Sequence, residues 1–220
     1  MTAIVPRDNV GGRPEALTLL VGPRELLVVA GLPGAGKSTV LRRLRCRDEL
    51  VVLDSDQVRD ALRSLLPAGV PYRWYRPLVH LVHRLRIVAA AVTAPGPLVV
   101  HEPTTRVSTR AMFVVLGVLT RRPRGMLWLD VSPTEALAGQ QARGRMLSAR
   151  SFGRHVRRAA LLLGRLRDGR APTGWQDVVV LTRPQVTGGL HIVVDADEVT
   201  GARRLPSTLG PVPRAGYHTQ

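Results

Sequence analysis

The sequence predicts an α/β fold of three layers, in which a mostly parallel sheet of about five strands is covered by helices on both faces. Short apolar runs alternate with longer amphipathic segments along the chain, as is typical of strands joined by crossover helices. Aromatic residues make up only 4% of the 220 residues. The core must therefore consist mainly of Leu, Val and Ala, which suits helices packed on a buried parallel sheet.

The expected strands are continuous apolar runs that end at glycine or at polar residues. The first covers residues 25–30 and leads into a glycine-rich segment; the next three cover 50–53, 98–101 and 126–129. Two short runs, 178–181 and 191–194, compete for the fifth strand, and the second is favoured because it ends at Asp195. Helices are expected between these runs, at residues 37–45, 58–65, 78–93, 109–119, 133–145 and 149–167.

The chain is expected to form one domain over residues 23–200, between a loose N-terminal segment at 1–22 and a disordered C-terminal tail at 201–220. Charged residues precede any apolar run at the N-terminus, and the later apolar runs are too short to span a bilayer. The single cysteine, Cys46, excludes an internal disulfide. These features favour a cytoplasmic protein without a membrane partner.

The charge of the chain is strongly positive, at +16, and only one of its 32 basic residues is a lysine. A GC-rich genome would explain arginine in place of lysine, but it would not explain the excess of positive charge. That excess indicates an anionic partner such as phosphate, nucleic acid or an acidic surface. Residues 143–170 hold nine arginines against one acid, Asp168. This basic stretch is either a nucleic-acid contact or a solvated face.

A glycine-rich segment follows the first expected strand and opens the first expected helix. It has the spacing of a P-loop, whose glycines permit a tight turn and whose backbone N–H groups cradle phosphates. Lys37 would reach the β- and γ-phosphates, and Ser38 would bind Mg²⁺. ATP is favoured over GTP because the guanine-reading Asn-Lys-x-Asp pattern would need a second lysine. The expected nucleotide-binding residues are Gly31, Leu32, Pro33, Gly34, Ala35, Gly36, Lys37, Ser38 and Thr39.

The P-loop together with Asp54-Ser-Asp56-Gln-Val-Arg59 resembles the P-loop kinases of the polynucleotide kinase and zeta-toxin type, relatives of adenylate kinase, over about residues 25–200. The resemblance implies that Asp56 deprotonates the acceptor hydroxyl and that Arg59 binds the acceptor. A carboxylate opposite the γ-phosphate suits that role chemically. The alternative is that Asp54 or Asp56 only caps the following helix.

The third strand departs from the Val-x-Asp-x-Thr pattern of these kinases. Here Val100-His-Glu102-Pro-Thr104 puts Glu102 where the family has the aspartate that contacts Mg²⁺ through water. Glu102 and Thr104 are therefore expected at the substrate, with Glu102 also at the metal. His101 is either a proton carrier or a structural hydrogen-bonding group.

The resemblance also implies a helical lid with arginines that close over the nucleotide, expected at about residues 133–167. Arg143 and Arg145 are the candidate catalytic residues of this lid, and the alternative is a basic solvated turn. Residues 72–76 hold three of the chain's eight aromatic residues. They either contact the acceptor or fasten a helix to the sheet.

The sequence thus favours a kinase that uses ATP and Mg²⁺ to phosphorylate a hydroxyl of a small molecule or of a nucleic-acid end. The alternative is a regulatory nucleotide-binding ATPase, or switch, that acts through a basic partner-binding surface. The nature of the acceptor and the oligomeric state stay open at this point.

Overall fold

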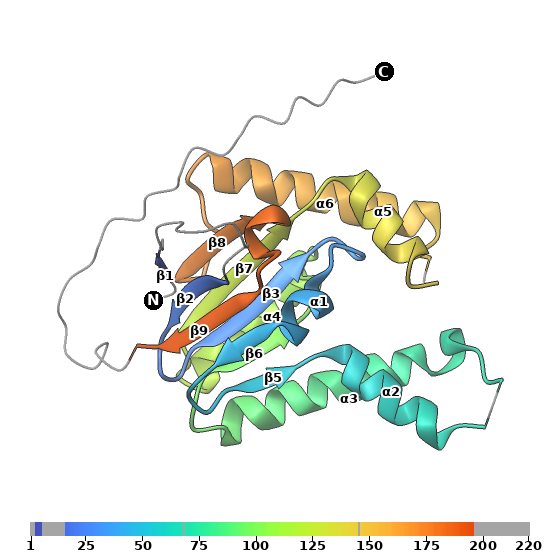
Figure 1. The fold of residues 1–220 in the computed structure, drawn as a ribbon, viewed down its shortest axis with the longest axis horizontal. Helices are drawn as coiled ribbons and strands as arrows, with labels where there is room; N and C mark the ends of the chain where they lie inside the picture. The colour runs from blue at the N-terminus through green and yellow to red at the C-terminus, as the bar shows by residue number, and fades with distance from the viewer. Residues whose placement is uncertain (1–2, 6–15, 68, 145, 196–220) are drawn as a thin grey trace.

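A computed structural model describes residues 3–5, 16–67, 69–144 and 146–195. Its centre is a five-stranded sheet in the order β5-β6-β3-β7-β8, with every neighbouring pair parallel. The strands are β3 (Leu26–Gly31), β5 (Val51–Leu53), β6 (Leu98–His101), β7 (Arg124–Asp130) and β8 (Asp177–Thr182). Helices cover both faces (Figure 1). The predicted three-layer α/β fold is confirmed.

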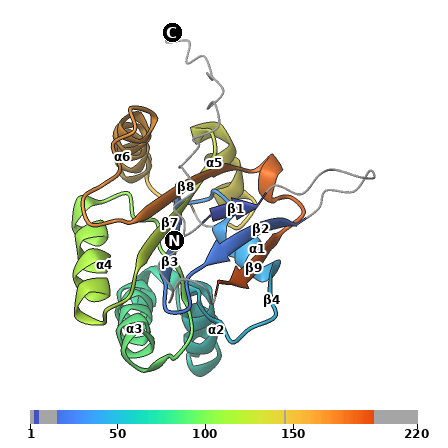
Figure 2. The same cartoon turned by 90° about the vertical axis from the view of Figure 1, so that its left-hand side faces the viewer.

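Right-handed crossovers between parallel strands determine which helix lies on which face of this sheet. The helices are α1 (Lys37–Arg42), α2 (Ser55–Leu65), α3 (Tyr72–Thr93), α4 (Val107–Leu119), α5 (Pro133–Gln141) and α6 (Ala149–Arg167). Figure 2 shows α3, α4 and α6 along one face of the sheet, and α1 on the other. Among the described residues, no helix is long and apolar enough to cross a membrane.

A second, four-stranded sheet lies on the same side of the central sheet as α1 (Figure 2). Its order is β1-β2-β9-β4, formed by β1 (Ala3–Val5), β2 (Leu17–Val21), β9 (Leu190–Val194) and β4 (Leu44–Cys46). β1 is antiparallel to β2, and the other pairs are parallel. Leu19 and Ile192 are fully buried in the same core as the central sheet, so the two sheets form one packed unit.

The second sheet corrects two expectations. Residues 17–21, expected in the loose segment 1–22, form β2. The fifth strand of the central sheet is β8, and the favoured run 191–194 lies instead in β9 between β2 and β4. Both corrections have the same physical cause. The backbone groups of β2 need a hydrogen-bonded neighbouring strand, and β9 is that strand. The expected tail at 201–220 lies outside the described residues.

β4 holds α1 in place through long-range contacts. The helix ends at Arg42, and the chain then pairs Leu44 with Leu190 of β9. Arg43 Nη1 donates to the carbonyl of Thr187 at 3.0 Å. Gly189 lies so near that a Cβ there would be 2.8 Å from the carbonyl oxygen of Arg43. The C-terminal end of α1 is therefore held in place by the segment that follows β8.

Candidate functional site

The glycine-rich loop joins β3 to α1 in the order that the sequence predicts, at the carboxyl edge of the sheet. Gly31, Gly34 and Gly36 have φ values of 141°, 94° and 101°, which side chains rarely tolerate. A Cβ on Gly31 would lie 2.7 Å from the Leu129 carbonyl oxygen. Gly36 starts α1, and no described side chain caps that helix end. Its first N–H groups therefore suit an anion.

Lys37 is buried at the start of α1 and turns back onto the loop. Its Nζ donates to the carbonyl oxygens of Gly31 at 3.0 Å and Leu32 at 2.8 Å. Burial lowers the pKa of Lys37 to about 7, and the positive charge of Arg143 contributes to this shift. The negative charges of Glu102 and Asp54 raise the pKa but do not outweigh the other two effects. A buried ammonium with only carbonyl partners gains strongly from an anion placed beside it.

Asp54 and His101 join the ends of two neighbouring strands, β5 and β6. His101 Nδ1 lies 2.6 Å from Asp54 Oδ1 and 3.3 Å from Ser38 Oγ. Burial alone would raise the pKa of Asp54, but the hydrogen bond and charge of His101, with smaller effects of Asp56 N–H and Ser38, hold it well below its ordinary value. Asp54 is thus an ionised carboxylate next to the predicted metal ligand Ser38.

The same carboxylate decides which acid caps α2. Asp54 accepts a hydrogen bond from the backbone N–H of Asp56 at 3.0 Å and is the N-cap residue. Asp56 lies two residues further on, within the first turn of α2, and does not serve as the cap. The capping role, which the sequence left open between the two acids, therefore falls to Asp54.

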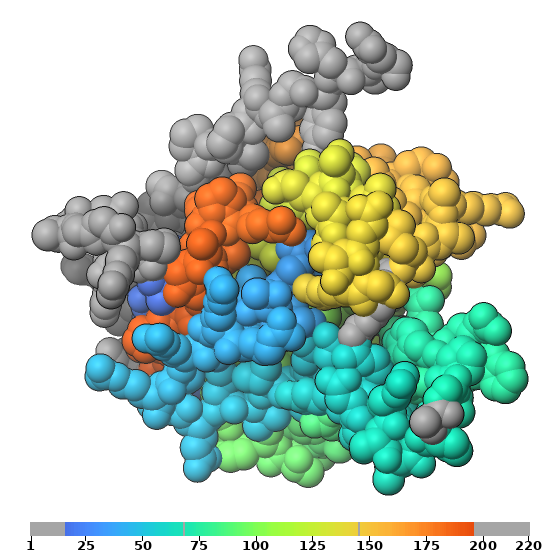
Figure 3. Space-filling model, turned by 45° about the vertical axis from the view of Figure 1, so that its right-hand side comes forward, coloured from blue at the N-terminus to red at the C-terminus, as the bar shows by residue number. Residues whose placement is uncertain are grey.

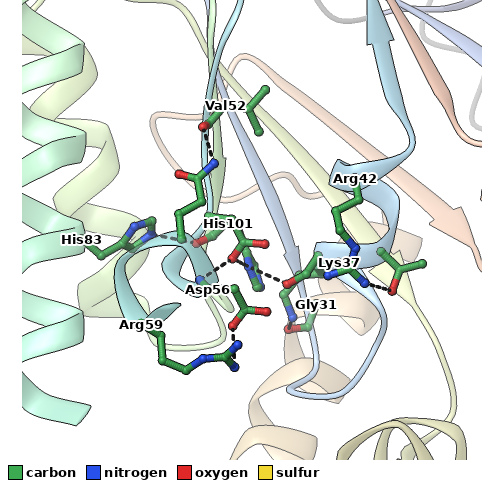
Figure 4. A network of polar contacts seen from close by, with 12 residues as sticks. Gly31, Lys37, Arg42, Val52, Asp56, Arg59, His83 and His101 are labelled. Carbon is green, nitrogen blue, oxygen red and sulfur yellow. Dashed lines mark hydrogen bonds and ion pairs between the residues drawn. The ribbon is translucent and has the colours of Figure 1, made fainter. Parts of the chain in front are cut away.

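His83 of α3 contacts the end of β6. Its Nε2 lies 3.1 Å from the carbonyl oxygen of His101, and burial lowers the pKa of His83 to about 4. Figure 4 shows His83, His101 and Lys37 in one network of polar contacts. His83 is therefore a neutral imidazole at pH 7 that contacts the backbone carbonyl of His101.

Glu102 follows His101 and is 7% exposed. Its Oε1 lies 3.7 Å from Arg84 Nη2 of α3. Burial raises the pKa of Glu102, while the charges of Arg84, His101 and Lys37 lower it. Glu102 thus lies within electrostatic reach of the P-loop lysine, and its place at the metal stays a prediction.

Thr104 has an unusual backbone. Its φ is 46°, a left-handed value that β-branched residues rarely adopt. Its Oγ1 is buried and has no hydrogen-bond partner among the described residues, although its carbonyl accepts from Arg110 Nη1 at 2.8 Å. Strain of this kind persists where the surroundings impose it and is frequent at functional sites.

Asp56 and Arg59 share the first turns of α2. Arg59 Nη1 lies 3.4 Å from Asp56 Oδ1, and the two side chains are 18% and 22% exposed, respectively. Arg59 also pairs with the exposed Asp60. Burial raises the pKa of Tyr72, with Arg76 and Arg59 opposing and Asp56 adding to the shift. Tyr72 therefore lies within electrostatic reach of both predicted acceptor residues, whereas Trp74 is 72% exposed.

Helix α5, the first helix of the expected lid, packs directly on the P-loop. Gln140 Nε2 of α5 donates to the Pro33 carbonyl at 3.0 Å, and a Cβ on Gly139 would overlap the carbonyl of Gly34. Figure 3 shows the blue P-loop region between the yellow α5 region and the blue-green α2. Exposed Arg143 follows α5 and acts electrostatically on Lys37. Arg145 lies outside the described residues.

Mg²⁺ at nucleotide sites binds one or two carboxylates together with phosphate oxygens and water. Ser38, Asp54 and Glu102 offer that kind of donor set. No group of three or more His, Cys, Asp and Glu side chains able to hold a metal occurs in the described part of the chain. These donors therefore suit a metal that arrives with phosphate, not an all-protein metal centre.

The sequence did not predict the contacts of Asp54 with His101 or of Arg84 with Glu102. The first had a usable signal, since both residues end strands that become neighbours in a sheet of this class. The second depends on the rotation of α3 against the sheet, for which we find no sequence signal.

Comparison with known proteins agrees with this geometry. A family model described as an AAA domain matches residues 26–161. A search of curated protein sequences finds no match. A solved structure from the PezAT toxin–antitoxin system of Streptococcus pneumoniae is similar at a TM-score of 0.54 and 15% identity, over 74% of this chain and 69% of that one.

Two further structures are similar at lower scores. One is a putative kinase from Chloroflexus aurantiacus, with a TM-score of 0.47 and 16% identity over 73% of this chain and 85% of that one. The other is a gluconokinase from Sinorhizobium meliloti, with a TM-score of 0.38 and 15% identity over 74% and 84%. The family match over residues 26–161 shows that this chain belongs to the AAA domain family and is a nucleotide-binding P-loop protein, and its fold is similar to that of the Streptococcus pneumoniae structure.

Proposed function

We propose that the protein is a kinase that transfers the γ-phosphoryl group of ATP to a hydroxyl of a small molecule or of a nucleic-acid end. One observation carries this proposal: two acids that are two residues apart have separate tasks. Asp54 caps α2 and pairs with His101, whereas Asp56 faces Arg59 and Tyr72. Asp56 thus lies beside Arg59 and close to Tyr72, where it could act on an acceptor bound next to α2.

The half of the site formed by the P-loop, the nucleotide half, would hold the nucleotide phosphates. Lys37 would exchange its two carbonyl partners for phosphate oxygens, and the N–H groups at the start of α1 would donate to them. Mg²⁺, when bound, would neutralise phosphate charge beside Ser38 and Glu102. Asp54, oriented by His101, would keep Ser38 in place.

The α2 half would hold the acceptor. Asp56 would accept the proton of the hydroxyl as its oxygen bonds to the γ-phosphorus and the bond from that phosphorus to the β–γ bridging oxygen breaks. Arg59 and the Thr104 hydroxyl, which has no hydrogen-bond partner in the described part of the chain, are available to bind polar groups of the acceptor. Arg143, together with Arg145, would add positive charge to the transferred group.

A second function is favoured by the surface. The helices α3, α4 and α6 carry many arginines and no acid, so the alternative of a regulatory ATPase, or switch, that meets an anionic partner keeps a physical basis. In that case Asp56 would have no proton to accept, and hydrolysis would be slow.

ADP release separates the two functions. Purified protein with ATP and Mg²⁺ is assayed alone and with pooled alcohols, sugars and 5′-hydroxyl oligonucleotides. A kinase releases ADP faster with one of the pools, and the phosphorylated product appears in the same sample. If no pool accelerates ADP release, the kinase proposal fails and the regulatory ATPase is retained.

A further inference from the structure

The helix α3 exposes an apolar stripe along its whole length. Its members are between 46% and 72% exposed. They recur at alternating intervals of four and three residues, which is the spacing of a coiled-coil seam. We define the α3 stripe as Trp74, Leu78, Leu81, Leu85, Val88 and Val92.

The opposite side of α3 already forms the contact with the rest of the domain. That side consists of Tyr75, Val79, His83, Ile87 and Ala91, which are all buried. At 3.6 residues per turn the α3 stripe points away from these residues. A helix that is apolar on two opposite sides is normally covered on both, so the α3 stripe has the composition of a second contact surface.

The neighbouring helix also exposes apolar side chains. α4 lies beside α3 on the same face of the sheet (Figure 2). It exposes Val115, Val118 and Leu119, at 56%, 59% and 77%. Apolar side chains gathered on two adjacent helices indicate an interaction site more strongly than scattered ones do.

The charges around the stripe point to the nature of the partner. The three helices on this face hold four arginines in α3, one in α4 and six in α6, and none of them contains Asp or Glu. Arg73 is exposed beside the α3 stripe, as is Arg84, whose guanidinium also lies 3.7 Å from Glu102. A second copy would add more arginines along the seam, which is unfavourable, whereas glutamates or aspartates at flanking positions would pair with them.

We infer that the α3 stripe is a docking site for an amphipathic helix of another protein, with apolar residues at heptad spacing and acidic residues beside them. A lipid surface is the weaker match, since membrane-binding helices present a broad apolar face and the α3 stripe is narrow. This inference does not depend on kinase activity.

The test uses a fluorescein-labelled helical peptide that is monomeric and about three heptads long, with Leu at the seam and Glu at both flanks. Binding is followed by fluorescence anisotropy. The double variant Leu81→Gln/Leu85→Gln alters two residues that are 56% and 59% exposed, and Leu161→Gln on α6, at 72%, is the matched control. Circular dichroism checks that all variants are folded, and basal ADP release should be unchanged in each.

We expect saturable binding to the wild type and to Leu161→Gln, and at least about tenfold weaker binding to the double variant. A peptide with Lys in place of Glu should also bind at least about tenfold more weakly. Absence of saturable binding, or equal binding by all variants, overturns the inference. Two further outcomes also overturn the inference, each in the absence of peptide binding. One is a dimer in sedimentation equilibrium that the double variant abolishes, and the other is binding to phosphatidylglycerol vesicles that the double variant abolishes.

Discussion

The two halves of the site differ in how firmly the fold holds their side chains. In the nucleotide half, Lys37, Ser38 and Asp54 are all buried and each has a hydrogen-bond partner. In the proposed acceptor half, Asp56 and Arg59 are partly exposed and lie 3.4 Å apart. Buried polar groups must be paired for the chain to fold. Folding therefore fixes the side chains of the nucleotide half, whereas the partly exposed side chains of the acceptor half can change conformation.

This difference suggests that the donor is specified by a fixed cradle and the acceptor by a few adjustable groups. A change in the nucleotide half should remove turnover as a whole. A change in the acceptor half should remove transfer and leave nucleotide binding intact.

The largest effect is expected for Lys37→Ala. Losing the only ammonium at the phosphates should lower kcat/KM for ATP by about 10²- to 10³-fold. Lys37→Arg should also be impaired, because a planar guanidinium cannot occupy the same buried space. ADP release at varied ATP measures both. Activity within about threefold of wild type in Lys37→Ala would contradict the P-loop assignment.

Asp56→Asn should separate the two halves. Without a base, transfer to an acceptor found in the ADP-release screen should fall by about 10²- to 10⁴-fold, while ATP affinity measured by calorimetry stays the same. Asp60→Asn is the matched control, because Asp60 is exposed on the same helix and also pairs with Arg59. Equal loss in both variants would show that Arg59 pairing, not proton transfer, is what matters.

His101→Ala should disturb the nucleotide half more mildly. Without its hydrogen bond, Asp54 no longer holds Ser38, and the Mg²⁺ concentration for half-maximal activity should rise by about tenfold. His101→Asn, which retains a donor near Nδ1, should recover part of this loss. A lower Tm with an unchanged Mg²⁺ dependence would indicate that His101 only stabilises the fold.

The smallest effect concerns protons. With a pKa of about 7 in the free protein, Lys37 is mostly neutral at pH 8, and bound phosphates should hold it protonated. ATP binding at pH 8 should therefore take up a fraction of a proton, and less at pH 6. Calorimetry in two buffers of different ionisation enthalpy measures this uptake. Lys37→Ala should abolish it, and equal uptake in that variant would assign the proton elsewhere.

The same pKa has a consequence for stability, with a definite sign. Lys37 titrates near 7 when folded and near 10.5 as a model group, so between these values the unfolded chain binds the additional proton. Its contribution to the free energy of unfolding therefore rises with pH across that window. Thermal unfolding of wild type and Lys37→Ala between pH 7 and 9 should show the rise in the wild type alone.

Local signals predicted the nucleotide half and four strands of the central sheet. The P-loop spacing, and apolar runs that end at polar residues, are readable within a few residues. The acids Asp54 and Asp56 were both identified, but only the structure assigns the cap to Asp54. The roles of Asp56, Arg59 and Arg143 remain predictions that the experiments above test.

The elements that sequence patterns missed depend on distant partners or on prolines. β2 was missed, and β9 was predicted as a strand but assigned to the wrong sheet; the two strands pair Leu17 with Leu190, and no local pattern predicts that contact. The first helix stops at Arg42 because the chain then enters β4, and not at residue 45 as expected. α3 starts at Tyr72, earlier than the expected residue 78, with Pro71 at its N-cap and Pro77 inside it.

The pairing of β4 with β9 also affects the order in which the protein can be assembled. Leu44 follows the P-loop helix almost directly, yet its partner Leu190 is near the end of the described chain. Contacts between such distant segments form late, and a growing chain exposes the earlier segment until the later one is made. On the ribosome, we therefore expect the complete P-loop motif to emerge long before β4 can pair with β9. Only after that pairing would α1 be fixed in place and able to bind a nucleotide.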